Sequence, residues 1–88
     1  MDTKQKYVRL KEYNQIIIFH TCTEHSTFRY LNPISAGFCY VHSDKVSCFG
    51  KSISLNIEGM EDDSYIATKQ IFGWEAADKF NNQKRGTK

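Results

Sequence analysis

Short segments rich in β-branched and aromatic residues dominate the pattern along the chain. Residues 15–22 begin apolar on both faces, over Ile16–Phe19, which predicts an interior strand. Residues 36–42 and 45–49 are two further apolar segments, and the Ser43-Asp44 pair between them is typical of a turn. This order of elements predicts a β-hairpin.

Strict alternation follows the hairpin. Gly50-Lys51 forms either a tight turn or a bulge within one long strand. Every second residue of 52–57 is apolar, so we expect Ile53, Leu55 and Ile57 to face a core and the polar residues between them to face water.

Two segments indicate helices. Residues 23–31 fit a short helix or helical turn that ends before Pro33, although part of this segment also alternates like a strand. After Gly59 the apolar residues recur at helical spacing, which predicts a main helix whose buried stripe holds Met60, Ala67, Ile71 and Trp74. Gly73 either ends this helix or bends the chain before residues 74–80.

The predicted architecture is α+β. It has one small antiparallel sheet of about four strands packed against one main C-terminal helix, with a short helix or turn after the first strand. The 88 residues form a single domain, because a chain of this length buries only about 60% of its unfolded surface. Within it we expect residues 1–14 to be a basic arm or an edge strand, residues 15–80 the globular core, and residues 81–88 a frayed basic tail.

Composition and charge exclude several classes of protein. Hydrophobic residues make up 40% of the chain and charged residues 25%, which is typical of a globular protein and not of a disordered one. No apolar run approaches the ~20 residues that span a bilayer, so no membrane partner is predicted. The net charge is +2, with basic residues gathered at both ends. An acidic cluster suited to a helix N-terminus holds Glu58, Glu61, Asp62 and Asp63.

Three cysteines and three histidines are candidate metal ligands. An odd cysteine count without an apolar leader segment argues against a disulfide framework, so we expect a cytoplasmic protein with reduced thiols. The short spacings are typical of zinc chelates, but Cys39 and His42 point to opposite faces of a strand, and buried thiols with scattered histidines explain the same residues. No metal or cofactor is therefore predicted, and the zinc candidates kept at low rank are His20, Cys22, His25, Cys39, His42 and Cys48.

A basic and aromatic N-terminal segment is the candidate nucleic-acid site. Phe38 and Tyr40 also share a strand face with His42, and a sheet that presents aromatic rings beside Lys and Arg can stack single-stranded bases. Against this, the signature of the RNA-recognition motif is absent and the near-neutral charge gives a weak electrostatic footprint. The candidate residues of the N-terminal segment are Lys4, Lys6, Tyr7, Arg9 and Lys11.

The leading functional interpretation is a non-enzymatic protein-interaction module that self-associates as a homodimer. Ile16–Phe19 and Phe38–Val41 are apolar on both sides, and one helix covers only one face of a sheet. Two sheet edges offer a second route to pairing. The first alternative is a single-stranded nucleic-acid-binding protein. The second is a small ligand-binding protein or enzyme with a pocket between sheet and helix, although no catalytic motif or catalytic residue is identified.

Overall fold

A four-stranded antiparallel sheet forms the centre of the protein, of which the computed structural model describes residues 3–79. The strand order across the sheet is β2-β1-β3-β4. The strands are β1 (Lys4–Leu10), β2 (Ile16–Phe19), β3 (Pro33–Val41) and β4 (Val46–Phe49). The predicted hairpin is confirmed, because β3 and β4 pair with Phe38 opposite Phe49 and Cys39 opposite Cys48.

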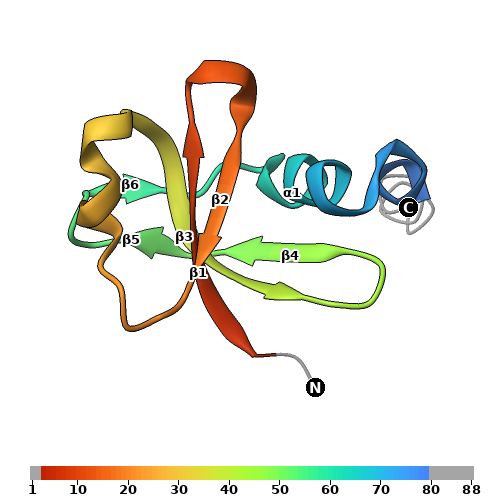
Figure 1. Cartoon of the computed structure of the whole chain (residues 1–88), viewed down its shortest axis with the longest axis horizontal. Coiled ribbons are helices and arrows are strands. Elements are labelled where there is room, and N and C mark those ends of the chain that lie inside the picture. Colours follow the sequence, from red (N-terminus) through yellow and green to blue (C-terminus); the bar gives the residue numbers. More distant parts are fainter. Residues whose placement is uncertain (1–2, 80–88) are drawn as a thin grey trace.

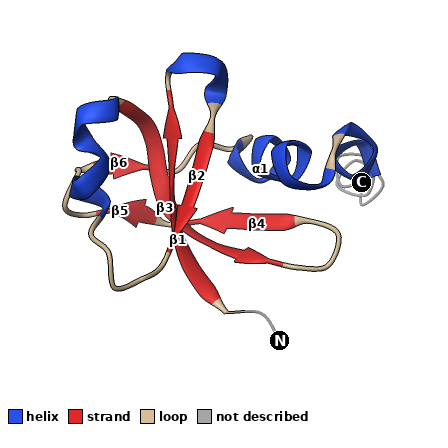
Figure 2. Cartoon of the chain, in the orientation of Figure 1, coloured by secondary structure: helices blue, strands red, loops and turns tan. Residues whose placement is uncertain are grey.

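Helices and a second, two-stranded sheet pack around this centre. Helix α1 lies on one side of the main sheet, and the 3-10 helix η2 lies with the β5–β6 pair on the other (Figure 1). The predicted α+β class, C-terminal helix and short helix are confirmed (Figure 2). The elements are η1 (Glu12–Asn14), η2 (His25–Leu31), β5 (Lys51–Ser52), β6 (Ile57–Glu58) and α1 (Asp63–Phe72).

The N-terminal segment supplies an inner strand of the main sheet. β1 pairs with β2 on one side and with β3 on the other, so that Val8 lies opposite both Ile17 and Ala36. Both faces of β1 are buried, because Tyr7 packs toward α1 and Val8 toward η2. Residues 4–10 are therefore neither the predicted arm nor an edge strand. β2 pairs with β1 alone, so it is an edge strand and not the predicted interior one.

The predicted strand over residues 52–57 is wrong. Residues 53–56 form a turn between β5 and β6, and Asn56 has a left-handed φ of 56° that a strand does not allow. Ser52 is buried, and its hydroxyl accepts a hydrogen bond from the Leu55 N–H at 3.2 Å. Leu55 reaches the core as expected, whereas Ile53 is 86% exposed.

The predicted buried stripe of the main helix is also wrong in most of its members. Ala67 is fully buried, but Ile71 is 43% exposed, Trp74 is 66% exposed, and Met60 precedes the helix at the surface. Gly73 ends α1 with a φ of 96°, and residues 74–79 continue as a separate helical segment. The chain therefore changes direction before Trp74, so the Trp74 ring does not continue the buried side of α1.

Polar side chains of α1 bond to the outer backbone of both edge strands. On β4, the Thr68 hydroxyl accepts from the Val46 N–H at 2.9 Å and the Ser64 hydroxyl accepts from the Cys48 N–H at 2.8 Å. On β2, the Gln70 amide bonds both the N–H and the carbonyl of Ile16, at 2.7 and 2.6 Å. Helix α1 thus satisfies edge groups that would otherwise need another strand.

Apolar clusters fill both sides of the sheet. The cluster on the α1 side consists of Tyr7, Ile16, Cys39, Val46 and Ala67. The cluster on the opposite side consists of Val8, Leu10, Ala36 and Leu55, with Phe28 and Leu31 of η2 packed against it. Residues 3–79 contain no helix with the length and apolar character to cross a membrane. The predicted tail, residues 81–88, lies outside the described residues.

Thr68→Val should lower the free energy of unfolding by about 1–3 kcal/mol, because it leaves the buried Val46 N–H without its partner at nearly constant side-chain volume. Trp74→Ala is the matched control, and its exposed ring should change stability by no more than about 1 kcal/mol. Urea denaturation followed by circular dichroism measures both. A larger loss in Trp74→Ala than in Thr68→Val would contradict the role assigned to α1.

Candidate functional site

A partly exposed group of aromatic side chains lies on the sheet face opposite α1, next to the part that η2 covers. Phe38 lies opposite Lys6 of β1 and Phe49 of β4, and the alternation of β3 puts Tyr40 on the same face. Phe38 and Tyr40 are half-buried, and Phe49 is 43% exposed. We call Phe38, Tyr40 and Phe49 the aromatic platform.

The three rings of the aromatic platform form a row. The Phe38 and Phe49 centroids are 6.1 Å apart at 29°, and the Tyr40 and Phe49 centroids are 5.6 Å apart at 19°. His42 extends the row, because its ring centroid lies 6.4 Å from that of Tyr40 and its Nε2 shares a hydrogen bond with the Ser47 hydroxyl at 3.1 Å. Ring pairs at these separations attract each other, so the contacts within the row favour this arrangement.

Lysine side chains accompany the aromatic platform. The Lys4 ammonium lies 4.9 Å from the centroid of the Phe38 ring, a cation–π contact. The Lys6 ammonium donates to the Thr23 carbonyl at 2.9 Å and lies 3.9 Å from the Glu24 carboxylate. Lys4 therefore places positive charge beside the row, whereas the charge of Lys6 is partly balanced by Glu24.

A pocket of about 280 Å³ adjoins the Phe38 end of the aromatic platform. Its lining is mixed in charge and consists of Lys6, Glu24, His25, Phe38, Lys51, Ile53 and Ser54. The His25 ring is buried, meets Phe38 edge-on at 5.7 Å, and donates from Nε2 to the Gly37 carbonyl at 2.8 Å. Burial lowers the pKa of His25 from its ordinary 6.5, so this wall of the pocket is neutral at pH 7.

Gly50 shapes the junction between the pocket and the aromatic platform. Its φ of 78° lies in the left-handed region, and a Cβ at this position would meet the Phe38 ring at 3.3 Å. Gly50 therefore forms the turn between β4 and β5. Because it has no side chain, the backbone can pass close to the Phe38 ring.

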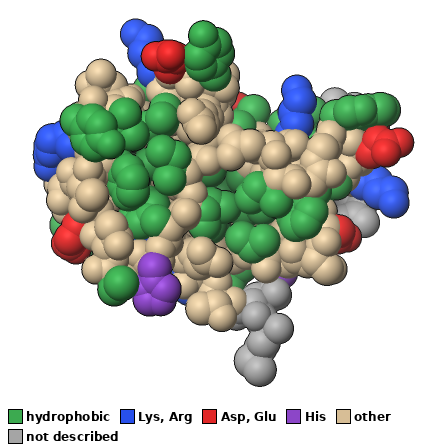
Figure 3. Space-filling model, in the orientation of Figure 1, with side chains coloured by type: hydrophobic (Ala, Val, Ile, Leu, Met, Phe, Trp, Pro, Cys, Tyr) green, Lys and Arg blue, Asp and Glu red, His purple; other side chains and the backbone are tan. Residues whose placement is uncertain are grey.

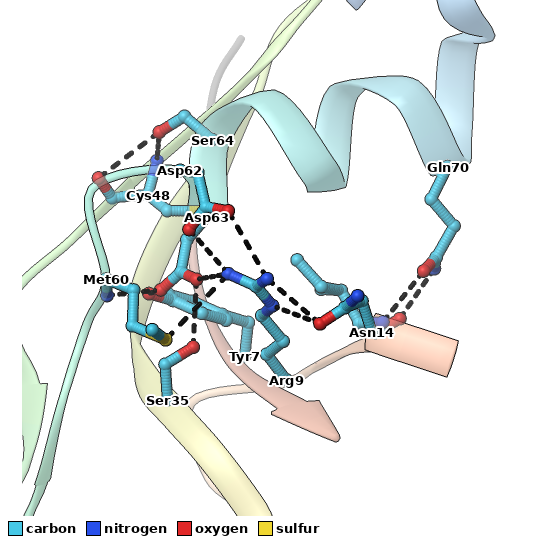
Figure 4. A network of polar contacts seen from close by, with 11 residues as sticks. Tyr7, Arg9, Asn14, Ser35, Cys48, Met60, Asp62, Asp63, Ser64 and Gln70 are labelled. Atoms are coloured by element: carbon cyan, nitrogen blue, oxygen red, sulfur yellow. Dashed lines mark hydrogen bonds and ion pairs between the residues drawn. The ribbon is translucent and has the colours of Figure 1, made fainter. Parts of the chain in front are cut away.

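Tyr7 and Arg9 lie on the other face, in a buried network centred on the carboxylate of Asp63 (Figure 4). Asp63 accepts hydrogen bonds from the Tyr7 hydroxyl, from the Arg9 guanidinium at 3.0 Å and from the Ser35 hydroxyl at 2.9 Å. It also accepts from the Met60 N–H at 2.8 Å, just before α1 begins. The network thus ties the start of α1 to β1 and β3.

Arg9 joins further groups to this network. Its guanidinium bonds Asp62 at 2.6 Å and the Asn14 side-chain oxygen at 2.9 Å. The bond from Arg9 lowers the pKa of Asp62. Burial and the bond to Asp63 raise the pKa of Tyr7. Every buried side-chain nitrogen and oxygen within residues 3–79 has a hydrogen-bond partner, so the buried part of the network stabilises the fold.

The structure therefore divides the predicted nucleic-acid residues. Lys4 and Lys6 lie beside the aromatic platform, Tyr7 and Arg9 are buried on the α1 side, and Lys11 is exposed beyond the end of β1. The sequence did not single out Phe49 or Lys51. The hairpin register contained the signal for Phe49, because a turn at Ser43-Asp44 already places it near Phe38.

The zinc candidates lie in separate places. His20 accepts from the Cys22 N–H at 3.1 Å in the exposed segment after β2, whereas the His25 ring packs between Phe19 and Phe38. Cys39 and Cys48 face α1, and His42 lies at the end of β3 beside Ser47. Between residues 3 and 79 no three His, Cys, Asp or Glu side chains converge as a metal site would require.

Comparisons with known proteins add no assignment. No protein-family model, curated protein or solved structure matches this chain. The functional argument therefore depends on the residues described above.

Asp63→Asn should lower the free energy of unfolding by about 3–5 kcal/mol, because it takes a buried carboxylate away from Arg9. Asp62→Asn is the matched control on the same guanidinium, and its 54% exposed side chain should cost only about 1 kcal/mol or less. Urea denaturation of both variants at pH 7 measures the difference. Equal losses would show that Asp63 is not the centre of the network.

The ring of His25 should titrate below pH 6.5 in the folded protein. The unfolded chain then binds a proton that the folded chain does not, so the contribution of His25 to stability is present above pH 6.5 and is lost as the pH falls through the folded pKa. NMR titration of the histidine rings measures the pKa, and urea denaturation at pH 7.5 and pH 5 measures the loss. A His25 pKa at or above 6.5 is the contrary result.

Proposed function

We propose that this protein binds single-stranded nucleic acid on the aromatic platform. The observation that carries the proposal is the row of Phe38, Tyr40 and Phe49 on one sheet face, with Lys4 and Lys6 of β1 alongside. Aromatic rings stack bases of any sequence, and lysines beside them meet the phosphates. The chain thus combines both parts of a single-strand binding surface.

The geometry suggests how a strand would lie. Bases stack on the exposed ring of Phe49 and on its neighbours, while the backbone passes Lys4 of β1. A base that stacks on Phe38 displaces the Lys4 ammonium from that ring, and the freed ammonium reaches a phosphate. Lys51, at the rim of the adjoining pocket, extends the positive charge past the Phe38 end of the row.

The other interpretations stay predictions. Self-association as a homodimer depended partly on two sheet edges open to a partner, but side chains of α1 occupy the outward backbone groups of Ile16, Val46 and Cys48. Figure 3 shows hydrophobic side chains on the face seen there, including the region of η2 and the region between β2 and α1. That exposure alone does not specify a partner, so we advance the nucleic-acid proposal.

Phe49→Ala should weaken binding to a fluorescent oligothymidine or oligouridine by roughly 5- to 150-fold, which is the effect of about 1–3 kcal/mol of lost stacking. Fluorescence anisotropy at low salt measures the dissociation constant. Tyr13→Ala removes a ring that is 89% exposed and lies outside the platform, so it should leave binding unchanged. Circular dichroism checks that both variants are folded.

Salt provides the second part of this test. Contact with about two phosphates predicts that affinity falls roughly sevenfold between 50 and 200 mM salt, and Lys4→Ala should flatten this slope. The proposal fails if the unmodified protein binds no oligonucleotide at 50 mM salt. It also fails if Phe49→Ala and Tyr13→Ala bind equally well.

A further inference from the structure

Two of the cysteines lie directly opposite each other on neighbouring strands. Cys39 of β3 and Cys48 of β4 are partners in the ladder, so their side chains share the face that α1 covers. Both are free thiols, Cys39 fully buried and Cys48 half-buried. The third cysteine, Cys22, is exposed in the segment that follows β2.

The hydrogen bonds of Cys48 identify the kind of ladder position. Its N–H donates to the Ser64 hydroxyl at 2.8 Å, and its carbonyl accepts from the same hydroxyl at 3.5 Å. Both backbone groups therefore point away from β3, and Cys39 and Cys48 form a non-hydrogen-bonded pair. In such pairs the Cα atoms are typically about 4.5 Å apart, within the range of about 4.4–6.8 Å that a disulfide spans.

We propose that Cys39 and Cys48 are a redox modification site that forms a cross-strand disulfide. The oxidant is a low-molecular-weight disulfide such as glutathione disulfide. The Cys48 thiolate attacks one sulfur of the oxidant, whose S–S bond breaks and releases one thiol. The Cys39 thiolate then attacks the Cys48 sulfur and releases the second thiol. The protein loses two electrons and two protons, which the two released thiols carry away.

The surroundings of the pair make this reaction slow in the folded state. Burial raises the pKa of Cys39 to about 11, and burial together with the neighbouring Cys39 raises the pKa of Cys48. Thiolate is therefore scarce at pH 7, and oxidation should speed up by about tenfold per pH unit below these values. Once formed, the bond would join β3 to β4 behind the aromatic platform.

The test equilibrates full-length Cys22→Ser protein in graded ratios of glutathione disulfide to glutathione at pH 8, starting from the reduced and from the oxidised side. Intact mass and the count of free thiols after denaturation report the state. We expect the loss of both thiols and of about 2 Da, with no glutathione retained. The ratio of glutathione disulfide to glutathione that oxidises half of the protein should be at least about tenfold lower in buffer than in denaturing urea. The reason is that the fold holds the two thiols next to each other.

Two variants and a second readout complete the design. Cys22→Ser combined with Cys39→Ser, or with Cys48→Ser, leaves one thiol that cannot form a disulfide within the chain, so its monomer either stays reduced or carries one glutathione. The oxidised Cys22→Ser protein should also unfold at a higher urea concentration than its reduced form. The proposal is overturned if both thiols persist, if glutathione stays on Cys48 while Cys39 remains free, or if buffer and urea require the same ratio.

Discussion

The polar side of α1 holds the structure together. Helix α1 packs Ala67 into the apolar cluster, and its Ser64, Thr68 and Gln70 side chains also bond to the outer backbone of the two edge strands. Asp63 adds the charged anchor at the start of the helix. A single helix therefore bonds to both outer strands, β2 and β4, and spans the sheet between them.

This arrangement decides which face of the protein is available to a ligand. Side chains that point toward α1 are held in the Asp63 network or in the apolar cluster around Tyr7 and Ala67. The other face is shared between η2, which covers the region of Val8 and Ala36, and the aromatic platform, which extends beyond it. The site is thus a consequence of how little chain remains to cover the second face.

The sequence revealed the parts of the fold whose signals are local. The β3–β4 hairpin was predictable because two apolar segments flank a strong turn pair, and the helix after Gly59 because its spacing changes. The position of β1 in the sheet was not predictable, because lysines at alternate positions make residues 4–10 resemble a solvated segment. Only the pairing with both neighbours shows that Tyr7 and Val8 are buried on opposite faces.

The same limit applies to the main helix and to the candidate site. Hydrophobicity alone assigned Ile71 and Trp74 to the core, but Thr68 is buried instead, because edge strands need hydrogen-bond partners more than they need another apolar contact. Lys4, Lys6 and the aromatic character of Phe38 and Tyr40 were visible in the sequence. Phe49 became part of the row only through the strand register.

The alternation of side chains along β3 and β4 links the nucleic-acid proposal with the disulfide proposal. Successive side chains alternate between faces, so Phe38 and Tyr40 face solvent while Cys39 between them faces α1, and Phe49 and Cys48 are divided in the same way. Because the net charge is only +2, the proposed binding would gain little from long-range attraction and would depend on the placement of the rings. A bond between Cys39 and Cys48 would constrain the two strands that set this placement, without touching a residue of the aromatic platform.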